Sequence, residues 1–214
     1  YCRELLTPLN IGRVIARPFT GTCKDTFKRT GNRHDYAISP PSPTVLEKLI
    51  SDGGKVTGIG KIGDIFAHTG MTKEIRASGH PALWCETLAV MDQPARSEDP
   101  RSIIITNFVD FDALYGHRRD IIGYGEALEE FDRHLPMLYT KMNPDDLLIL
   151  TADHGNDPSW HGTDHTREHV PILLYQQNAP SINHGFRESF ADIAQTIAKT
   201  FNLSPFEHGK PLDL

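Results

Sequence analysis

From residue 102 onward, short apolar runs alternate with longer segments whose apolar residues recur every three or four positions. Runs typical of buried strands occupy 102–111, 146–150 and 170–175, and helical stripes occupy 124–142 and 189–201. Strands that alternate with amphipathic helices predict an α/β fold with a substantially parallel sheet. Such sheets bind ligands at the carboxyl ends of their strands, so we expect a functional site in the loops that follow these runs.

The last helical segment carries signals for both its start and its buried face. Ser189 is followed three residues later by Asp192, which is typical of a capping box at the start of a helix. The helical spacing predicts a buried stripe made of Phe190, Ile193, Ile197 and Phe201. We expect this stripe to hold the helix against the rest of the fold.

The first hundred residues follow a different pattern of short strands and loops. Apolar residues at helical spacing over 44–52, closed by two glycines, predict a helix. The glycine-punctuated, β-branched segment 55–66 predicts a strand that leads into a close-approaching loop. Prolines interrupt 79–101, which favours a domain boundary near its end. The sequence therefore predicts one domain over 1–100 and a second over 101–214.

Charge and composition exclude several classes of partner. The chain carries 22 Lys and Arg against 28 Asp and Glu, a formal charge of −6, which argues against binding to nucleic acid or to an anionic membrane surface. No apolar run approaches the roughly 20 residues that span a bilayer. Cys2, Cys23 and Cys85 are odd in number and have no metal-binding spacing, which predicts a reducing, cytoplasmic compartment.

Three clusters of carboxylate and imidazole side chains lie beside the apolar runs of the second domain. They are Asp112 with His117, Asp153 with His154, and His161 with His165 and His169. Carboxylate and imidazole ligands on loops at strand ends suit Mn, Zn or Fe. An Asp-His pair alone is more often a cap or a surface hydrogen bond than a pair of metal ligands, and the three histidines could line one face of a helix. The conjunction of the clusters favours a metal site.

Longer motifs around these clusters carry a family resemblance. The segment TADHGNDPSWHGTDHTREHVPILLY resembles the C-terminal metal-binding signature of the alkaline phosphatase superfamily. The segments VDFDALYGHRRD, RVIARPF and FKRTGNRHDY are similar to those of the bacterial phosphopentomutase family. This resemblance implies the C-terminal part of an alkaline-phosphatase-like core, over 101–214, with an α+β cap domain over 1–100 that contacts substrate.

The resemblance also implies ligands, cofactors and a reaction. It assigns Asp153 and His154 to one metal and Asp112, His117 and His165 to the other, with two Mn²⁺ ions as cofactors and a sugar bisphosphate as activator. Enzymes of this family interconvert the 1-phosphate and 5-phosphate of ribose or deoxyribose through a phosphorylated-enzyme intermediate. Candidate contacts to the sugar phosphate are Arg29, Arg33, His34 and Lys61. A solvated basic loop is the alternative interpretation of these residues.

The chain departs from the family pattern at its start. The family's early metal-binding aspartate and its phosphoryl-acceptor threonine have no counterpart here, and Thr151 belongs to the metal motif itself. We therefore expect a C-terminal fragment whose partner is a missing N-terminal segment of the same protein, and we identify no catalytic residue in the chain. The alternatives are a cofactor-independent phosphoglycerate mutase, a metal-dependent phosphatase, or an inactive fragment.

Overall fold

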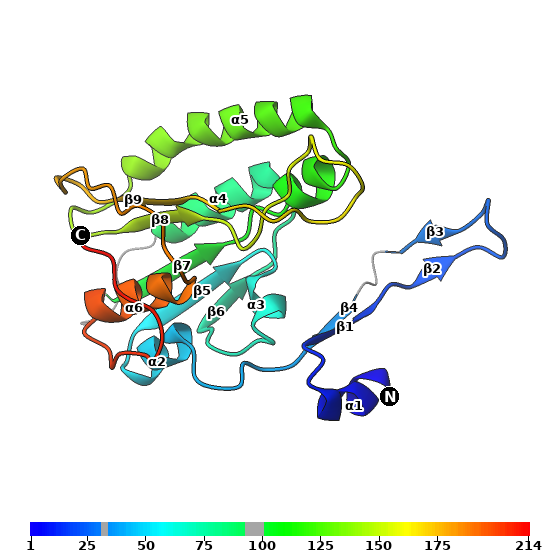
Figure 1. Cartoon of the computed structure of the whole chain (residues 1–214), viewed down its shortest axis with the longest axis horizontal. Coiled ribbons are helices and arrows are strands. Elements are labelled where there is room, and N and C mark those ends of the chain that lie inside the picture. Colours follow the sequence, from blue (N-terminus) through cyan, green and yellow to red (C-terminus); the bar gives the residue numbers. More distant parts are fainter. Residues whose placement is uncertain (31–33, 93–100) are drawn as a thin grey trace.

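An extended arm and a layered α/β body share the chain (Figure 1). The computed structural model describes residues 1–30, 34–92 and 101–214, with the side chain of Arg29 also outside the description. The arm begins with α1 (Cys2–Leu6) and the 3₁₀ turn η1 (Thr7–Leu9). Its strands pair antiparallel, β1 (Arg13–Ala16) with β4 (His34–Ala37) and β2 (Phe19–Thr20) with β3 (Lys28–Arg29).

A parallel sheet forms the centre of the body. Its strand order is β6-β5-β7, made of β6 (Lys73–Ile75), β5 (Lys55–Ile59) and β7 (Ser102–Thr106), and both pairings are parallel. Parallel neighbours need a crossover connection. The short helix α3 (Ile62–Ile65) lies between β5 and β6, and α4 (His80–Met91) lies between β6 and β7. The predicted α/β class with a parallel sheet is confirmed.

One cluster of the hydrophobic core lies between this sheet and helix α2 (Val45–Ser51), which confirms the helix predicted over 44–52. Thr44 and Glu47 form a reciprocal capping box, because each side chain accepts a hydrogen bond from the other residue's backbone N–H. Leu49 and Val56 are fully buried in the core cluster. The helix therefore begins at a strong cap and is held by burial of its apolar face.

A second helical layer covers the other side of the sheet. The helix α5 (Ile121–Tyr139) packs over α4 through an aromatic cluster centred on Trp84 (Figure 1). The ring centroid of Trp84 lies 4.9 Å from that of Phe131 and 5.0 Å from that of Phe108. This packing positions the loop after β7, which contains the π-helix η2 (Phe111–Gly116).

The strands β8 (Leu148–Thr151) and β9 (Ile172–Tyr175) differ from the prediction in direction. They were expected in a parallel sheet, but they pair with each other antiparallel as a separate ribbon. The connection over 152–171 contains no helix that could carry the chain back for a parallel pairing. The chain therefore returns directly, and the connection forms a long loop at one end of the ribbon.

The last helix, α6 (Ala191–Thr200), buries a polar face. Its buried residues are Asp192, Gln195, Thr196 and Ala198. The expected burial of Phe190 is wrong, because this side chain is 60% exposed, and the expected capping box is also absent. The physical reason is the C-terminal segment after residue 204, which packs on this face and whose backbone groups need polar partners.

Strand pairing crosses the boundary that was expected near Arg101. β5 pairs with β7, and the Arg101 guanidinium forms an ion pair with Asp52 at the end of α2. Helices α2 and α6 are also in contact. The division into a cap over 1–100 and a core over 101–214 stays a prediction. In the part of the chain that the structure describes, every helix is too short or too polar to cross a membrane.

Candidate metal centre

Two loops bring the acidic and imidazole clusters together. The first follows β7 and carries Asp112 and His117, and the second connects β8 to β9 and carries His165. One ligand atom from each of these three residues lies within 4.8 Å of the others. The Asp112 Oδ1 atom is 3.4 Å from His117 Nε2 and 3.2 Å from His165 Nε2. These residues are separated by up to 53 positions in the sequence and converge only in the fold.

The imidazole of His117 is held in one tautomer. Its Nδ1 lies 2.5 Å from the Thr163 carbonyl oxygen, which can only accept, so Nδ1 carries the proton. In the neutral ring, Nε2 then presents its lone pair toward Asp112. A lone pair that faces a carboxylate oxygen is unfavourable unless a proton or a metal cation lies between the two atoms. This arrangement of a carbonyl, an imidazole and a free Nε2 is the one that metal-binding histidines use.

A second pair repeats this pattern next to the first group. The Nδ1 atom of His154 is 3.1 Å from the Gly155 carbonyl oxygen, and its Nε2 is 3.6 Å from Asp153 Oδ2. The ring of His154 stacks on that of His165 with centroids 3.7 Å apart. The Asp153 side chain is 78% exposed. Among the described residues, no third acid or histidine joins this pair as a possible ligand.

The electrostatic environment favours a cation. Burial raises the pKa of Tyr124, and the negative charges of Glu168, Asp112 and Asp157 raise it further. Asp157 itself has a lowered pKa, because the Ser159 hydroxyl and backbone N–H both donate to its carboxylate. Three acidic side chains, Glu168, Asp112 and Asp157, therefore act electrostatically on one point beside the two loops.

The donor set also fits a transition metal. One carboxylate oxygen and two imidazole nitrogens suit Mn, Zn or Fe, and the Asp153 and His154 pair offers the same donor types. Two further histidines of the loop, His161 and His169, lie elsewhere: their rings contact Trp160 and Phe186. The loop therefore contributes one histidine, His165, to the group of three.

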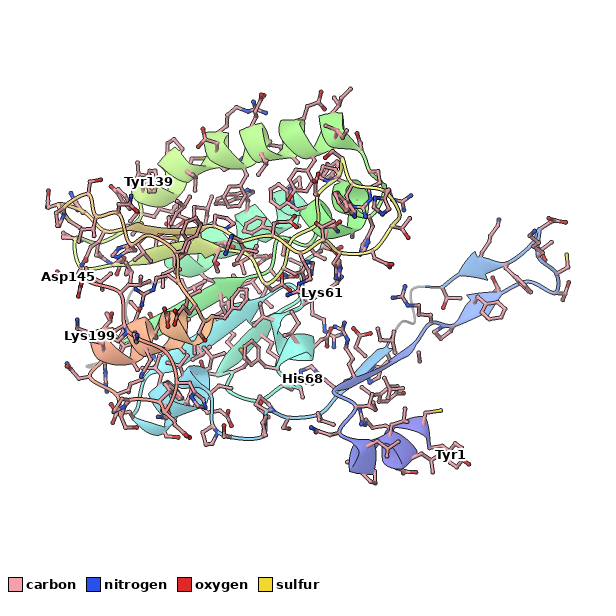
Figure 2. All side chains as sticks on the ribbon, in the orientation of Figure 1. Tyr1, Lys61, His68, Tyr139, Asp145 and Lys199 are labelled. Carbon is pink, nitrogen blue, oxygen red and sulfur yellow. The ribbon has the colours of Figure 1, made fainter. Side chains whose placement is uncertain are left out.

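Two of the four predicted substrate contacts lie at one cavity. His34 from β4 and Lys61 at the start of α3 line a polar cavity of about 220 Å³. Lys61 lies on the side of the body that faces the arm (Figure 2). Asp35, Asp64 and Arg76 also line it. Arg33 and the side chain of Arg29 lie outside the described part of the chain. The roles of all four residues stay predictions.

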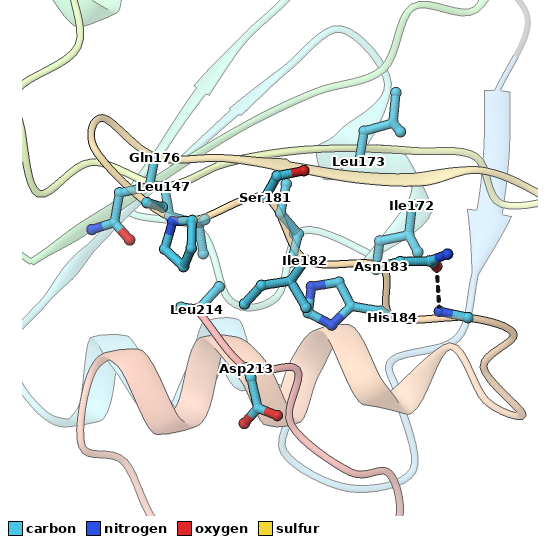
Figure 3. Close-up of a pocket in the computed structure, with 14 residues that line it drawn as sticks. Leu147, Ile172, Leu173, Gln176, Ser181, Ile182, Asn183, His184, Asp213 and Leu214 are labelled. Atoms are coloured by element: carbon cyan, nitrogen blue, oxygen red, sulfur yellow. Dashed lines mark hydrogen bonds between the residues drawn. The ribbon is translucent and has the colours of Figure 1, made fainter.

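A larger cavity lies away from these loops. It measures about 420 Å³ and lies between β9, the segment 179–185 and the C-terminus (Figure 3). Its lining includes the exposed side chains of Leu173, Ile182 and Leu214. No predicted ligand or substrate contact lines it.

Two residues that no sequence pattern singled out hold the candidate metal centre together. Asn156 donates from Nδ2 to Asp112 Oδ1 at 2.6 Å, and Arg119 donates to the carbonyl oxygens of both loops. Both residues lie inside the segments already singled out, TADHGND and GHRRD. Their types are common in loops, so only the fold reveals their partners.

Comparison with known proteins places the chain in a family. A model of the metalloenzyme superfamily matches residues 11–205. The chain is 61% identical over 211 residues to a phosphopentomutase of Chromohalobacter salexigens, covering 97% of the chain and 50% of that protein. It is 56% identical over 213 residues to a phosphopentomutase of Pectobacterium carotovorum, covering 98% of the chain and 51% of that protein. The corresponding phosphopentomutase of Yersinia enterocolitica is 54% identical over 211 residues, which is 97% of the chain and 51% of that protein.

These matches extend over both loops of the candidate metal centre. The chain spans about half the length of the curated relatives that it matches. The family model covers most of the chain, including every predicted metal ligand. The chain belongs to the metalloenzyme superfamily.

Proposed function

We propose that this chain forms the metal-binding part of a phosphopentomutase, which interconverts the 1-phosphate and 5-phosphate of ribose or 2-deoxyribose. The observation that carries the proposal is the convergence of Asp112, His117 and His165, whose ligand atoms lie within 4.8 Å of one another. The identity of 54–61% to phosphopentomutases supports this substrate class over other members of the superfamily.

We assign the metal ligands as two neighbouring sets. Asp112, His117 and His165 would hold one metal ion, and Asp153 with His154 would contribute to holding the other. We propose Mn²⁺ for both. When bound, a pair of such ions neutralises the charge of a transferred phosphoryl group. Thr163 and Gly155 support this assignment, because their carbonyl oxygens leave the Nε2 atoms of His117 and His154 free to bind metal.

The remaining work falls to side chains that bind and orient the substrate. We propose that His34 and Lys61, together with Arg29 and Arg33, bind the sugar phosphate, since cations match its charge. Residues 1–100 would act as a cap that excludes water, so that the phosphoryl group is retained during transfer. The sugar bisphosphate is proposed as the activator that primes the enzyme.

The phosphoryl acceptor is proposed to lie outside this chain, in the part of the relatives' length that it does not span. Thr151 stands beside the metal motif, but its hydroxyl donates to the Pro171 carbonyl oxygen at 2.9 Å within the β8–β9 ribbon. That hydrogen bond supports a structural role for Thr151. A further metal-binding aspartate is proposed in the same outside segment. We place the protein in the cytoplasm, which the free thiols of Cys2, Cys23 and Cys85 support.

A paired substitution tests the metal assignment in the full-length protein. His165→Ala should lower mutase activity by more than about 100-fold, because even loss of a group that only supports a ligand costs about 10–100-fold. His161→Ala is the matched control, since His161 lies in the same loop and contacts Trp160. Near-normal turnover of the His165 variant would refute the assignment.

Substrate and product assays separate the rival functions. A phosphopentomutase converts ribose 1-phosphate and releases almost no inorganic phosphate, whereas a metal-dependent phosphatase releases it stoichiometrically. A phosphoglycerate mutase acts on a three-carbon acid and leaves the pentose phosphate unchanged.

The intact mass of the purified protein, compared with 24.0 kDa for this sequence, tests the expectation of a further segment. The 214-residue chain alone should bind Mn²⁺ and lack mutase activity.

A further inference from the structure

The guanidinium group of Arg119 joins the two loops of the candidate metal centre. It donates hydrogen bonds to four backbone carbonyl oxygens, three of them in the loop that carries His165. The acceptors are Gly116 at 3.0 Å, Asp157 at 2.7 Å, Gly162 at 2.6 Å and Asp164 at 2.6 Å. Arg119 has a φ of 56°, a left-handed conformation that is uncommon outside glycine. The side-chain contacts therefore hold a backbone conformation that the residue does not favour by itself.

The fifth acceptor of Arg119 is the side chain of Asn156. Its Oδ1 accepts from Arg119 at 3.0 Å, and its Nδ2 donates to Asp112 Oδ1 at 2.6 Å. A guanidinium has only donors, so the carbonyl oxygen of the amide must face Arg119 and its NH₂ group must face Asp112. Asn156 is 8% exposed, which leaves its amide few other partners. Arg119 thus sets the orientation of a donor that reaches a candidate ligand.

The oxygen that Asn156 contacts is the one that faces both imidazoles. Asp112 Oδ1 lies 3.2 Å from His165 Nε2 and 3.4 Å from His117 Nε2. A carboxylate oxygen has two lone pairs. The hydrogen bond from Asn156 occupies one of them and leaves the other for a cation. Gly116 makes room for this amide, since a Cβ at that position would lie 2.5 Å from Asn156 Nδ2.

We propose that Asn156 is a positioning residue for Asp112 and that Arg119 acts through Asn156 by fixing the direction of its amide. The inference rests on the proposed metal-binding function. Asn156 holds Asp112 Oδ1 toward His117 and His165, and Arg119 keeps the two loops at the distance that this contact needs. Loss of either residue weakens metal binding without removing a ligand.

The test uses a double-mutant cycle in the full-length protein. The variants are Asn156→Ala, Arg119→Lys and the double variant, and Arg118→Lys is the matched control. Arg119→Lys keeps the charge and loses the planar fork. Arg118 is the adjacent arginine and is exposed. The readouts are the Mn²⁺ dissociation constant, followed by the electron paramagnetic resonance signal of free Mn²⁺, and the unfolding midpoint of the metal-free protein.

Each single variant should bind Mn²⁺ about 10–100-fold more weakly than wild type, which is the range for residues that support metal ligands. The double variant should bind no more weakly than Asn156→Ala alone, because Arg119 acts through that amide. The control should stay within about twofold. At saturating Co²⁺, the visible absorption of Asn156→Ala should differ from that of wild type, since the spectrum reports ligand geometry.

The outcomes separate this inference from the function on which it rests. Unchanged Mn²⁺ affinity in both single variants, with normal binding by wild type, overturns the inference alone. If the losses of Mn²⁺ affinity in the two single variants add up in the double variant, the action of Arg119 through Asn156 is overturned. Failure of wild type to bind Mn²⁺ overturns the metal assignment and the inference together. If Asn156→Ala does not fold, a normal affinity in Arg119→Lys still overturns the proposal.

Discussion

Replacing Thr196 by valine tests whether buried hydrogen bonds hold the C-terminal segment on α6. Thr196 is 0% exposed, and its Oγ donates to the Asp192 carbonyl oxygen at 2.7 Å. The Thr196 Oγ also accepts a hydrogen bond from the Leu212 N–H at 2.9 Å, and Leu212 is 1% exposed. Valine has nearly the same shape as threonine, so the substitution removes the hydroxyl without opening a cavity.

The size of the effect follows from which group loses its partner. The Asp192 carbonyl oxygen keeps its helical hydrogen bond from the backbone of Thr196. The Leu212 N–H loses its acceptor in a buried position, which costs about 1–3 kcal/mol. The added methyl group returns at most about 0.8 kcal/mol. We expect the free energy of unfolding to fall by about 1–2 kcal/mol.

Equilibrium unfolding in urea measures this change, provided that the m-value stays constant. Thr200→Val is the matched control on the same helix. Its Oγ donates to the Thr196 carbonyl oxygen at 2.9 Å, and the residue is exposed, so we expect a change below about 0.5 kcal/mol. Equal midpoints for the two variants would refute the argument that Thr196 satisfies a buried N–H.

Three further predictions follow from packing and charge. Gly54→Ala should lower the free energy of unfolding by about 1–3 kcal/mol, because the added Cβ would lie 2.6 Å from Leu49 Cγ. Gly125→Ala should raise it by about 0.5–1 kcal/mol, because Gly125 lies in open space on α5 and alanine favours a helix. Thermal unfolding would show opposite shifts, and shifts of one sign would contradict the packing argument. Burial lowers the pKa of His80 from 6.5, so the unfolded chain takes up the proton first and stability should fall as the pH drops below that value. His80→Phe should remove this part of the dependence, which unfolding at about pH 7.5 and about pH 5.5 would measure. Burial opposes ionisation of Asp192, but the Lys210 N–H and the Arg187 guanidinium outweigh it and lower the pKa below 3.8. The stability that Asp192 contributes should therefore be lost as the pH falls through that lowered value. An Asp192→Asn variant whose free energy of unfolding falls with decreasing pH as steeply as that of wild type would contradict this.

Most elements of the body could be predicted from periodicity and capping signals. Local pattern alone predicts the helix over 44–52 and the strands β7, β8 and β9. The relative direction of β8 and β9 could not be predicted, because a short apolar run has the same pattern in a parallel and in an antiparallel pairing. The buried face of α6 was also missed, since the C-terminal segment that covers it supplies polar backbone groups.

At the candidate metal centre, too, some features could be predicted from the sequence and others depended on the fold. The sequence by itself determined the residue types and their places beside strands: Asp112, His117 and His165 carry a recognisable motif whatever their partners. Only the tertiary structure decided which atoms meet, because Asp112 and His165 are 53 positions apart and approach through the packing of two loops. The roles of Asn156 and Arg119 were decided by the tertiary structure alone. A hydrogen bond between residues 37 positions apart leaves no periodic trace in the sequence, since its energy depends on geometry that exists only after the chain has folded.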